Sequence, residues 1–445
     1  MIKNLTVFKE RFSRIFIGLS SFQMLAMFRR GLFYSYLSIY LRYFLGLSVT
    51  ETTLFATLPM VLNVSFQTFV WGVLSDKFQL RRTLVIGGEV LAGIGTIIVF
   101  YSHRLVDEKF IAGWIVILGL SIVEIFWSMS NTGWTALISD LYSLEKRIEV
   151  QGNLASLGGI GRIVGVWVGG LLYDGFQLSS YFKDWVFYEG WGFYEGPLFF
   201  VAAGVMFLST IPMVFIPEGG IEYESRSLEQ DKFQIEKKTT SSNQIFIVFV
   251  IALAFINFGR NSIAIIIPQF LVLESGFAVS SELLSYIINT QSVAIVLMGF
   301  IVGGISFHLG NGKTMLFGAG MAVLALIMFV STDLFLIFVA SFLRGASQAI
   351  ILASAYAFAS GLIAPRNRAK LFGIYNATFF LSWGLAGTIL AGPIIDLLIM
   401  TGTSELLAYK ASFLVAGLVT LVGIVILIFL LLWMRTKEMS ENLNK

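Results

Sequence analysis

Cysteine is absent from the 445-residue chain, and histidine occurs only twice, as His103 and His308. Without cysteine there is no disulfide framework, no thiolate metal site and no cysteine nucleophile. Two histidines leave too few nitrogen ligands for a typical zinc site. The sequence therefore predicts neither a bound metal nor a cofactor.

Charged residues are also scarce, at 13% of the chain, whereas 57% of the residues are hydrophobic. Soluble domains carry about 25% charged residues, so a soluble protein of this length would lack polar side chains to cover its exterior. The net charge of +3 is too small to indicate a nucleic-acid partner. The composition favours an integral membrane protein over a soluble enzyme or a nucleic-acid binder.

Long apolar runs dominate the chain. A helix needs about 20 mostly apolar residues to cross a bilayer, and twelve segments qualify. The strands of a membrane barrel would instead alternate apolar and polar residues over about ten positions. The predicted spans are 15–41, 52–74, 83–102, 111–138, 149–173, 198–216, 245–270, 282–306, 314–332, 334–361, 371–396 and 411–434.

Lysine and arginine are unevenly distributed between the predicted loops. Cytoplasmic loops carry the excess of these residues in membrane proteins, which predicts that both termini are cytoplasmic. The outer loops then hold only Arg42, Arg104, Lys109, Lys183 and Lys410. We expect a multi-pass protein of the cell membrane.

The longest polar stretch, 217–244, divides the spans into two sets of six. Its mixed charge predicts a solvated cytoplasmic linker between an N-terminal bundle, 1–216, and a C-terminal bundle, 245–445. The halves repeat at one constant offset, which overlays Phe28, Arg30, Tyr40, Leu41, Gly46 and Val49 on Phe258, Arg260, Phe270, Leu271, Gly276 and Val279. An offset one residue larger overlays Gly72, Ser75, Arg82 and Thr83 on Gly303, Ser306, Lys313 and Thr314. Internal repeats are typical of secondary transporters, with the substrate site at the repeat interface.

The loop after the second span reads GVLSDKFQLRR from Gly72 to Arg82. This resembles the loop signature of the major facilitator superfamily, G-x-L-A/S-D-R/K-x-G-R/K-R/K. Gln79 and Leu80 replace a glycine and a basic residue of that signature, so the turn can differ here. The matching positions are Gly72, Leu74, Ser75, Asp76, Lys77 and Arg81.

The resemblance covers nearly the whole chain and implies an all-α fold of two pseudo-symmetric six-helix bundles. It also implies a gating latch, in which Asp76, Arg81 and Arg82 engage an acidic residue at the end of the fourth span. Here the acidic residue is expected to be Asp140. Such a latch would favour the outward-open state.

The fifth predicted span carries a second resemblance to the same superfamily. Glycines along one helix face allow close packing of a neighbouring helix, which is the simpler interpretation. In the superfamily this spacing, G-x8-G-x3-G-P-x2-G-G, is associated with exporters, notably proton-coupled drug efflux pumps. Val166 stands in place of the proline. The matching residues are Gly152, Gly161, Gly165, Gly169 and Gly170.

Charged residues fall in the middle of several predicted spans, at Arg29, Arg30, Glu124, Arg260 and Arg344. Each would cost about 2.5–3.5 kcal/mol at mid-bilayer, which favours pairing or a water-filled cavity. Helices 1, 4, 7 and 10 line the cavity in the superfamily, so the resemblance places these charges there. Polar residues three or four positions away from these charges lie on the same helix faces. The predicted substrate-binding set is Arg30, Arg260, Arg344, Gln23, Tyr34, Trp127, Asn131, Asn257, Asn261 and Gln348.

Arg30 and Arg260 occupy equivalent repeat positions and are predicted to converge. Paired guanidinium groups suit a carboxylate or phosphate, as in the organophosphate exchangers that the pair resembles. Arg29 points about 100° away and is expected to pair within its own bundle. Arg162, inside the glycine face, could pair with Glu89 or Glu124, or could contact substrate.

Two carboxylates are candidates for proton coupling, Glu124 and Glu89. Glu124 could be a protonatable switch or a static partner of an arginine on the first helix. Glu89 lies nearer the cytoplasmic end, where a structural pair is the alternative.

The sequence thus predicts a monomeric secondary transporter in the lipid bilayer that exports a small anionic or amphipathic organic solute, with protons as coupling ion. The alternatives are import, a proton-independent organic anion or organophosphate exchanger, and a non-transporting receptor on the same fold. The chain has no GxSxG, Walker A or HExxH motif, so no enzyme is predicted.

Overall fold

The structure is a computed structural model that describes residues 14–142, 144–174, 190–220, 243–362 and 368–443. The side chains of residues 76, 144–149, 151, 243, 368–370, 372–373 and 437–443 lie outside this description. Almost every described residue is helical, and no strand occurs among them, which confirms the predicted all-α fold.

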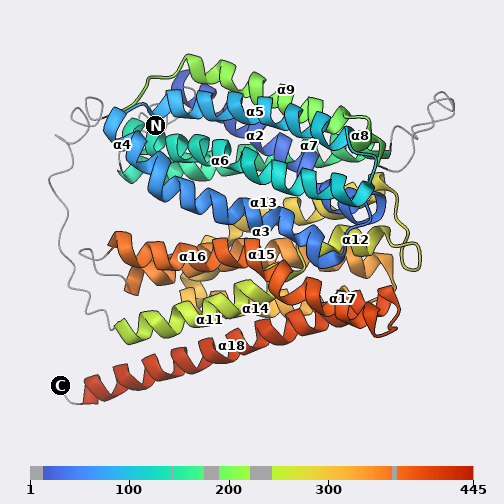
Figure 1. The fold of residues 1–445 in the computed structure, drawn as a ribbon. Coiled ribbons are helices and arrows are strands. Elements are labelled where there is room, and N and C mark those ends of the chain that lie inside the picture. Colours follow the sequence, from blue (N-terminus) through green and yellow to red (C-terminus); the bar gives the residue numbers. More distant parts are fainter. Residues whose placement is uncertain (1–13, 143, 175–189, 221–242, 363–367, 444–445) are drawn as a thin grey trace. The chain divides into compact units, whose positions relative to one another are not determined.

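The helices of the first half are labelled in Figure 1. Their bounds are α2 (Arg14–Ile39), α3 (Val49–Phe66), α4 (Gly72–Phe78), α5 (Arg81–Arg104), α6 (Lys109–Leu141), α7 (Leu144–Asp174), the short α8 (Trp191–Tyr194) and α9 (Pro197–Val214).

The second half is built in the same way. Its helices are α11 (Asn243–Ser262), α12 (Ile266–Val272), α13 (Ser281–Leu309), α14 (Asn311–Met328), α15 (Leu334–Leu362), α16 (Arg368–Ala386), α17 (Gly392–Met400) and α18 (Glu405–Leu443). Most predicted spans agree with these helices to within a few residues. The largest difference is at α18, which is longer at both ends than the predicted span 411–434.

Hydropathy did not predict the interruptions within the spans. Turns of π-helix occur at Tyr40–Phe44, Gln67–Trp71 and Gly387–Ala391, and α11 and α12 are separated by Ile263–Ile265. Pro268 in α12 has no N–H for the carbonyl of Ala264, which contributes to that break. Turns of π-helix within α-helices occur often at functional sites. They are invisible to hydropathy because every residue of an interrupted helix can remain apolar.

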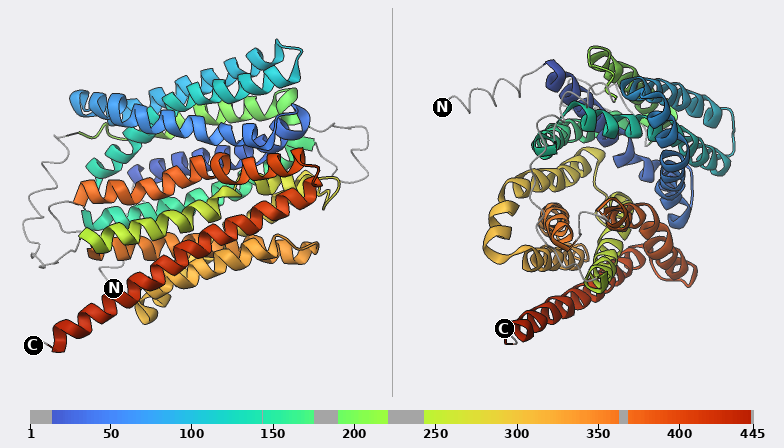
Figure 2. Two further views of the ribbon diagram at one scale, coloured as in Figure 1. Left: turned by 60° about the horizontal axis from the view of Figure 1, so that its bottom comes forward. Right: turned by 90° about the vertical axis from the view of Figure 1, so that its left-hand side faces the viewer.

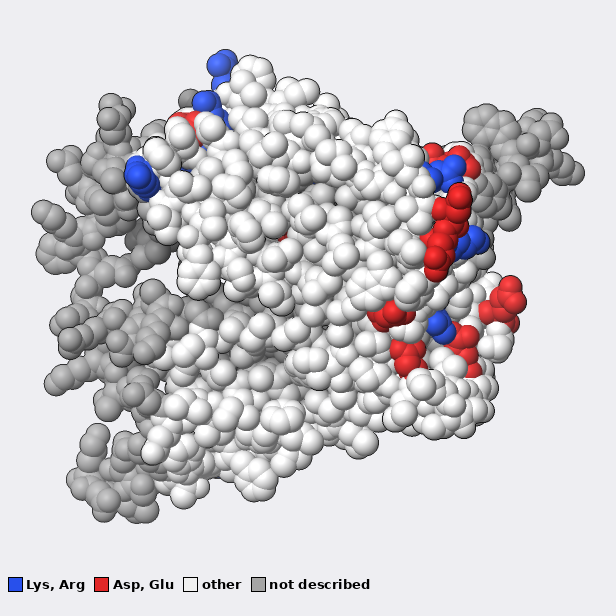
Figure 3. All heavy atoms as spheres, viewed as in Figure 1, with Lys and Arg blue, Asp and Glu red and all other residues white. Residues whose placement is uncertain are grey.

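Eleven of the described helical segments are long and apolar enough to cross a membrane. The predicted first span, α2, is long enough at 26 residues but is not one of them. The adjacent Arg29 and Arg30 lower its hydropathy. On the face in Figure 3, charged side chains gather at the helix ends, and the surface between them is almost free of charge.

The chain divides into two compact units. One unit comprises Met1–Leu47, Thr57–Ile235 and Ser280–Ser285; the other comprises Ser48–Ala56, Glu236–Val279 and Tyr286–Lys445. The start of α3 thus belongs to the second unit, where Asp396 accepts hydrogen bonds from the backbone nitrogens of Val49 (3.0 Å) and Thr50 (2.8 Å). Most of the predicted linker 217–244 lies outside the described residues, so that division stays a prediction.

Each unit has its own apolar core. In the first unit α2 packs against α7 and α9, and α5 packs against α6 and α9. In the second unit α11 packs against α16 and α18, and α14 packs against α15 and α18. Figure 2 shows α18 crossing other helices of its unit at an angle. Because the cores are apolar, the polar groups inside each unit stand out as candidates for function.

Candidate functional site

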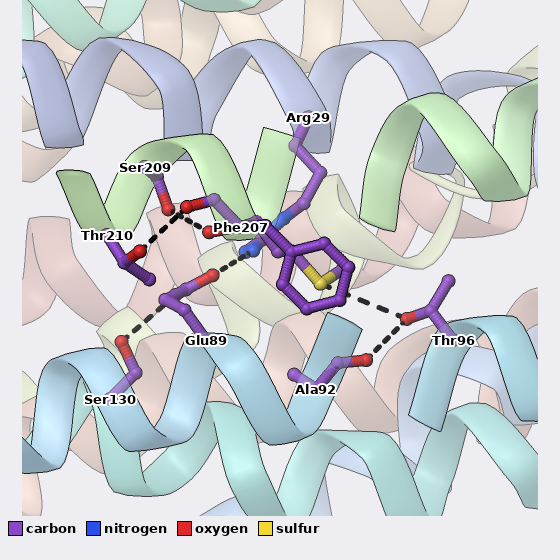
Figure 4. Close-up of polar contacts among 9 residues, drawn as sticks. Arg29, Glu89, Ala92, Thr96, Ser130, Phe207, Ser209 and Thr210 are labelled. Atoms are coloured by element: carbon purple, nitrogen blue, oxygen red, sulfur yellow. Dashed lines mark hydrogen bonds and ion pairs between the residues drawn. The ribbon is translucent and has the colours of Figure 1, made fainter. Parts of the chain in front are cut away.

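The buried charge of the first unit is an ion pair between α2 and α5 (Figure 4). Arg29 is 2% exposed, and its Nη1 lies 2.5 Å from Oε2 of Glu89. Ser130 on α6 donates to the other carboxylate oxygen at 3.0 Å. The guanidinium of Arg29 also lies 4.1 Å from the ring centroid of Trp127. Arg29 therefore pairs inside its own bundle, as its helical position predicts.

This ion pair involves Glu89, one of the two carboxylates predicted to couple protons. Glu89 is 3% exposed, and both of its oxygens are engaged by Arg29 and Ser130. A buried carboxylate with both oxygens bonded, one of them to an arginine, would lose these contacts if the pair were broken. The geometry favours the structural alternative for Glu89.

Glu124 on α6 has a different environment. Its carboxylate accepts a hydrogen bond from the amide of Asn63 on α3. The arginine partner expected from the first helix is not there: within the described residues, no arginine or lysine nitrogen lies within 4.0 Å of Glu124. Of the two alternatives for this carboxylate, the static ion pair with an arginine of the first helix is absent among the described residues. Asn63, which lies four residues before Gln67 in the second predicted span, belongs to the site instead.

Two arginines of the first unit also lack carboxylate partners. Arg30 is exposed, and Arg162 on α7 is half-buried. In the part of the chain that the structure describes, neither has a carboxylate oxygen within 4.0 Å. The pairing suggested for Arg162 with Glu89 or Glu124 does not form.

Aromatic and amide side chains accompany these charges. The ring centroids of Tyr34 and Trp127 lie 5.9 Å apart in an edge-on arrangement. Trp127 is 4% exposed, and its indole N–H has no hydrogen-bond partner among the described residues. Gln23 and Asn131 are half-buried on α2 and α6. The first unit thus carries an exposed arginine, a buried tryptophan and half-buried tyrosine and amide side chains.

In the second unit, Arg260 is held by its own helix. Its Nε and Nη2 lie 3.3 and 3.2 Å from Oδ1 of Asn257, and Asn257 in turn reaches Thr378 on α16 at 3.5 Å. One turn on, Asn261 donates to Ser382 at 3.0 Å. Arg260 is 6% exposed, so it is far more enclosed than its repeat counterpart Arg30.

Arg344 on α15 belongs to a chain of polar groups that reaches α13. Its Nη1 donates to Gln291 at 3.1 Å, and Gln291 donates to Gln348 at 3.2 Å. Sequence reasoning missed Gln291, which is 6% exposed; its only signal was an amide inside a long apolar run. Arg260 and Arg344 line one small cavity within this unit.

The predicted convergence of Arg30 and Arg260 would join the two units. It stays a prediction, and so does a substrate site shared by both halves.

The loop of the signature motif is organised by Arg81. Its Nε lies 3.2 Å from Oδ2 of Asp140 at the end of α6, and its Nη1 donates to Ser75 at 2.5 Å. Gly220 donates its backbone N–H to the same carboxylate at 2.8 Å. Gly72 is half-buried and Lys77 exposed. Asp76, the remaining acidic member of the predicted latch, has its side chain outside the description.

Gln79 occupies the place of the signature's second glycine. Its φ of +57° is left-handed, the conformation that glycine favours at a helix C-terminus. The turn is therefore made with a glutamine, at the cost of backbone strain.

A second ion pair joins the loop to the residues after α9. Nε of Arg82 lies 3.1 Å from Glu218, which also accepts from the backbone N–H (2.8 Å) and the hydroxyl (3.0 Å) of Thr83. Glu218 and Gly220 were missed by sequence reasoning, although PEGG was a visible turn signal. The predicted linker is thus fastened to the motif loop where it begins.

A model of the major facilitator superfamily matches residues 19–281 and 249–445. The chain belongs to the major facilitator superfamily. No curated protein matches the sequence.

Solved structures of this superfamily have the same fold. The nucleoside transporter NupG has a TM-score of 0.68 at 14% identity, covering 93% of this chain and 98% of that one. A bacterial homologue of the human lysosomal transporter Spinster, inward-facing and occupied, has a TM-score of 0.68 at 14% identity, with 93% and 95% covered. A bacterial homologue of the iron transporter ferroportin has a TM-score of 0.62 at 12% identity, with 92% and 98% covered. At such identities the likeness shows the fold alone.

The glycine face of α7, which resembles the exporter motif of the superfamily, packs directly on α2. A Cβ atom at Gly161, Gly165 or Gly169 would lie 2.2, 2.0 or 2.5 Å from a carbonyl oxygen of α2. A Cβ atom at Gly152, the first glycine of the motif, would meet nothing within 4 Å. The close approach of the two helices thus accounts for the repeating glycines and leaves Gly152 unexplained.

Proposed function

We propose that this member of the major facilitator superfamily is a proton-coupled secondary transporter that exports a small anionic or amphipathic organic solute. The supporting observation is the charge balance of the membrane-spanning helices. Arg30 and Arg162 have no carboxylate within 4.0 Å among the described residues, and Glu124 is the one midplane acid without a cationic partner there. This excess of positive charge favours a carboxylate or phosphate group on the solute.

Arg30 is the leading candidate for direct contact with the solute. It is exposed, whereas Arg260, its repeat counterpart, is 6% exposed and bonded to Asn257. Tyr34 and Trp127 would contact an apolar part of the solute, and Gln23 and Asn131 its polar groups. In the second unit, Arg344, Asn261 and Gln348 are half-buried and would complete recognition. Alternating access would come from rocking of the two bundles.

Glu124 would carry the coupling proton. A carboxylate that accepts one amide hydrogen bond, without a cation within 4.0 Å among the described residues, can be protonated without breaking an ion pair. Glu89 would have to break its pair with Arg29 to do the same. Solute binding near Arg30 would change the field at Glu124, which links the two events.

Efflux is supported by the resemblance of the α7 glycines to the exporter motif, and alternating access by the loop around Arg81. The protein would act as a monomer in the cell membrane. The organic anion or organophosphate exchanger is the second candidate, because the arginines alone would serve it without a proton.

Transport by purified protein in liposomes tests the proposal. We expect a pH gradient to drive accumulation of an organic anion, and Glu124→Gln to abolish this while sparing exchange of labelled for unlabelled solute. Arg30→Gln should abolish both. Arg104→Gln, which changes an arginine in the predicted outer loop, is the matched control. Full gradient-driven transport in Glu124→Gln would disprove the coupling role.

Active exchange without any effect of the gradient in the wild type would favour the proton-independent exchanger. A thermal-shift screen against anionic, cationic and neutral solutes identifies the solute class. Stabilisation by lipophilic cations alone would contradict an anionic solute.

A further inference from the structure

Three side chains of α13 and α15 in the second unit form a chain of hydrogen bonds. Nη1 of Arg344 donates to Oε1 of Gln291 at 3.1 Å, and Nε2 of Gln291 donates to Oε1 of Gln348 at 3.2 Å. Arg344 and Gln348 are half-buried and lie four residues apart, so they share one face of α15. Gln291 on α13 is 6% exposed and bridges them.

The direction of this chain is fixed by its first member. A guanidinium group has N–H donors and no acceptor, so only the amide oxygen of Gln291 can bond to Arg344. The amide nitrogen of Gln291 then points to Gln348, where it requires an oxygen. The orientation of both amides therefore follows from the chemistry of the arginine.

The backbone also holds Gln291 in place. A Cβ atom at Gly345 would lie 2.1 Å from the carbonyl oxygen of Gln291, so α13 and α15 are in close contact at this point. One turn earlier on α13, the carbonyl of Ile287 accepts from the hydroxyl of Ser341 at 2.6 Å. Reversing the buried amide of Gln291 would turn its N–H groups toward Arg344 and lose the bond to the cation, which is costly in a buried site.

Gln348 is the end of the chain and offers only donors. Its oxygen accepts from Gln291, and the side chain makes no other hydrogen bond within the described ranges. The amide nitrogen of Gln348 is not among the fully enclosed atoms without a partner. Its two N–H groups therefore remain open to a group that accepts hydrogen bonds.

We propose that Gln291 is a positioning residue that holds Gln348 with its amide N–H groups toward the solute. This part of the C-terminal bundle then recognises an acceptor, namely a carboxylate or phosphate oxygen. The assignment rests on the proposed function, and it adds the reason for rejecting amines: an ammonium group would meet only the donors of Arg344 and Gln348. Gln291 acts through Gln348 and does not itself contact the solute.

Exchange of side-chain amide protons with water tests the direction of the chain without any solute. It is measured by NMR on the purified full-length protein with ¹⁵N-labelled glutamine, and the signals are assigned by their loss in Gln291→Met and Gln348→Met. We expect slow exchange at Gln291 and fast exchange at Gln348. In Gln291→Glu, which keeps an acceptor for Arg344 but has no N–H to donate, the Gln348 amide should reverse and its protons should become slow. Slow exchange at Gln348 in the wild type would overturn the proposal.

A double-mutant cycle tests whether Gln291 acts through Gln348. Thermal shifts give the apparent affinities for phenylacetate and phenyl phosphate, with phenethylamine as the matched amine. Gln348→Met should weaken binding of the anions about tenfold, the effect of losing one hydrogen bond to a charged group. Gln291→Met should also weaken it, and most of that loss should disappear in the Gln348→Met background. Ser341→Ala, which removes a bond between the same two helices, is the matched control and should leave the affinities unchanged.

The outcomes of the cycle separate this assignment from the proposed function. Anion binding by the wild type with fully additive losses in the double variant would overturn the positioning role and leave the proposed function intact. Stabilisation by phenethylamine alone would contradict the anionic solute and the assignment together.

Discussion

Nη1 of Arg29 lies 2.5 Å from Oε2 of Glu89, while the next residue along the chain, Arg30, is exposed. Two adjacent arginines on α2 thus have opposite environments. Successive residues of a helix point about 100° apart, so one guanidinium lies inside the bundle and the other on its surface. The division separates a charge that is paired inside the bundle from one that is exposed.

The Arg29–Glu89 pair should make a large contribution to stability. Removing one partner of a buried ion pair leaves an uncompensated charge and costs about 3–5 kcal/mol. We expect Glu89→Gln to lower the unfolding free energy toward that range, measured by chemical unfolding in detergent. The double variant Arg29→Met with Glu89→Met should be more stable than Glu89→Gln, because it leaves no charge unpaired. A single variant as stable as the wild type would contradict the structural role.

The glycine contacts between α7 and α2 predict a strong positional effect. Gly165→Ala would place a Cβ atom 2.0 Å from the carbonyl oxygen of Phe28, so the helices must separate. Overpacking of this kind costs about 1–3 kcal/mol, visible as a lower unfolding temperature and reduced transport. Gly152→Ala is the matched control, because nothing lies within 4 Å of its added Cβ. Alanine there should be neutral or stabilising by up to about 1 kcal/mol. Equal effects at both positions would argue against close packing as the reason for the glycines.

The left-handed glutamine at the end of α4 predicts a stabilising substitution. Gln79 has a φ of +57°, and Gln79→Gly should relieve strain worth about 1 kcal/mol. Unfolding temperatures of the purified variants measure the gain. Gln79→Ala removes the same side chain but keeps the strain, so it should show no gain. If glycine and alanine behave alike, the strain is not the cause.

Asp140 joins the motif loop to the segment after α9, because its Oδ2 accepts from both Arg81 and the backbone of Gly220. Asp140→Asn should weaken both contacts and accelerate amide hydrogen exchange at residues 218–220. Since the chain has no cysteine, introduced cysteine pairs can carry spin labels without background. Distances measured across the helix ends that are predicted to be cytoplasmic would show whether the loop also changes the balance of the proposed transport states. Unaltered exchange in Asp140→Asn would contradict the fastening role of this carboxylate.

Most of the fold was predictable because it depends on composition along one dimension. Apolar runs such as 83–102 and 334–361 agree closely with α5 (Arg81–Arg104) and α15 (Leu334–Leu362), since the bilayer sets the length of a spanning helix. The loop from Gly72 to Arg82 and the glycines of α7 carried enough pattern to indicate the superfamily. Helical periodicity was also sufficient to separate Arg29 from Arg30.

The sequence alone therefore determined that this protein lies in a lipid bilayer, which of its helices cross the bilayer, and the family to which the chain belongs. Only the tertiary structure decided which charges are satisfied. It paired Glu89 with Arg29, bonded Glu124 to Asn63 rather than to an arginine, and placed Ser347 beside Arg260 without a partner for its hydroxyl. These outcomes depend on contacts between helices far apart in the chain. The cost of a buried charge or hydroxyl is set by its neighbours in space, which helical periodicity does not reveal.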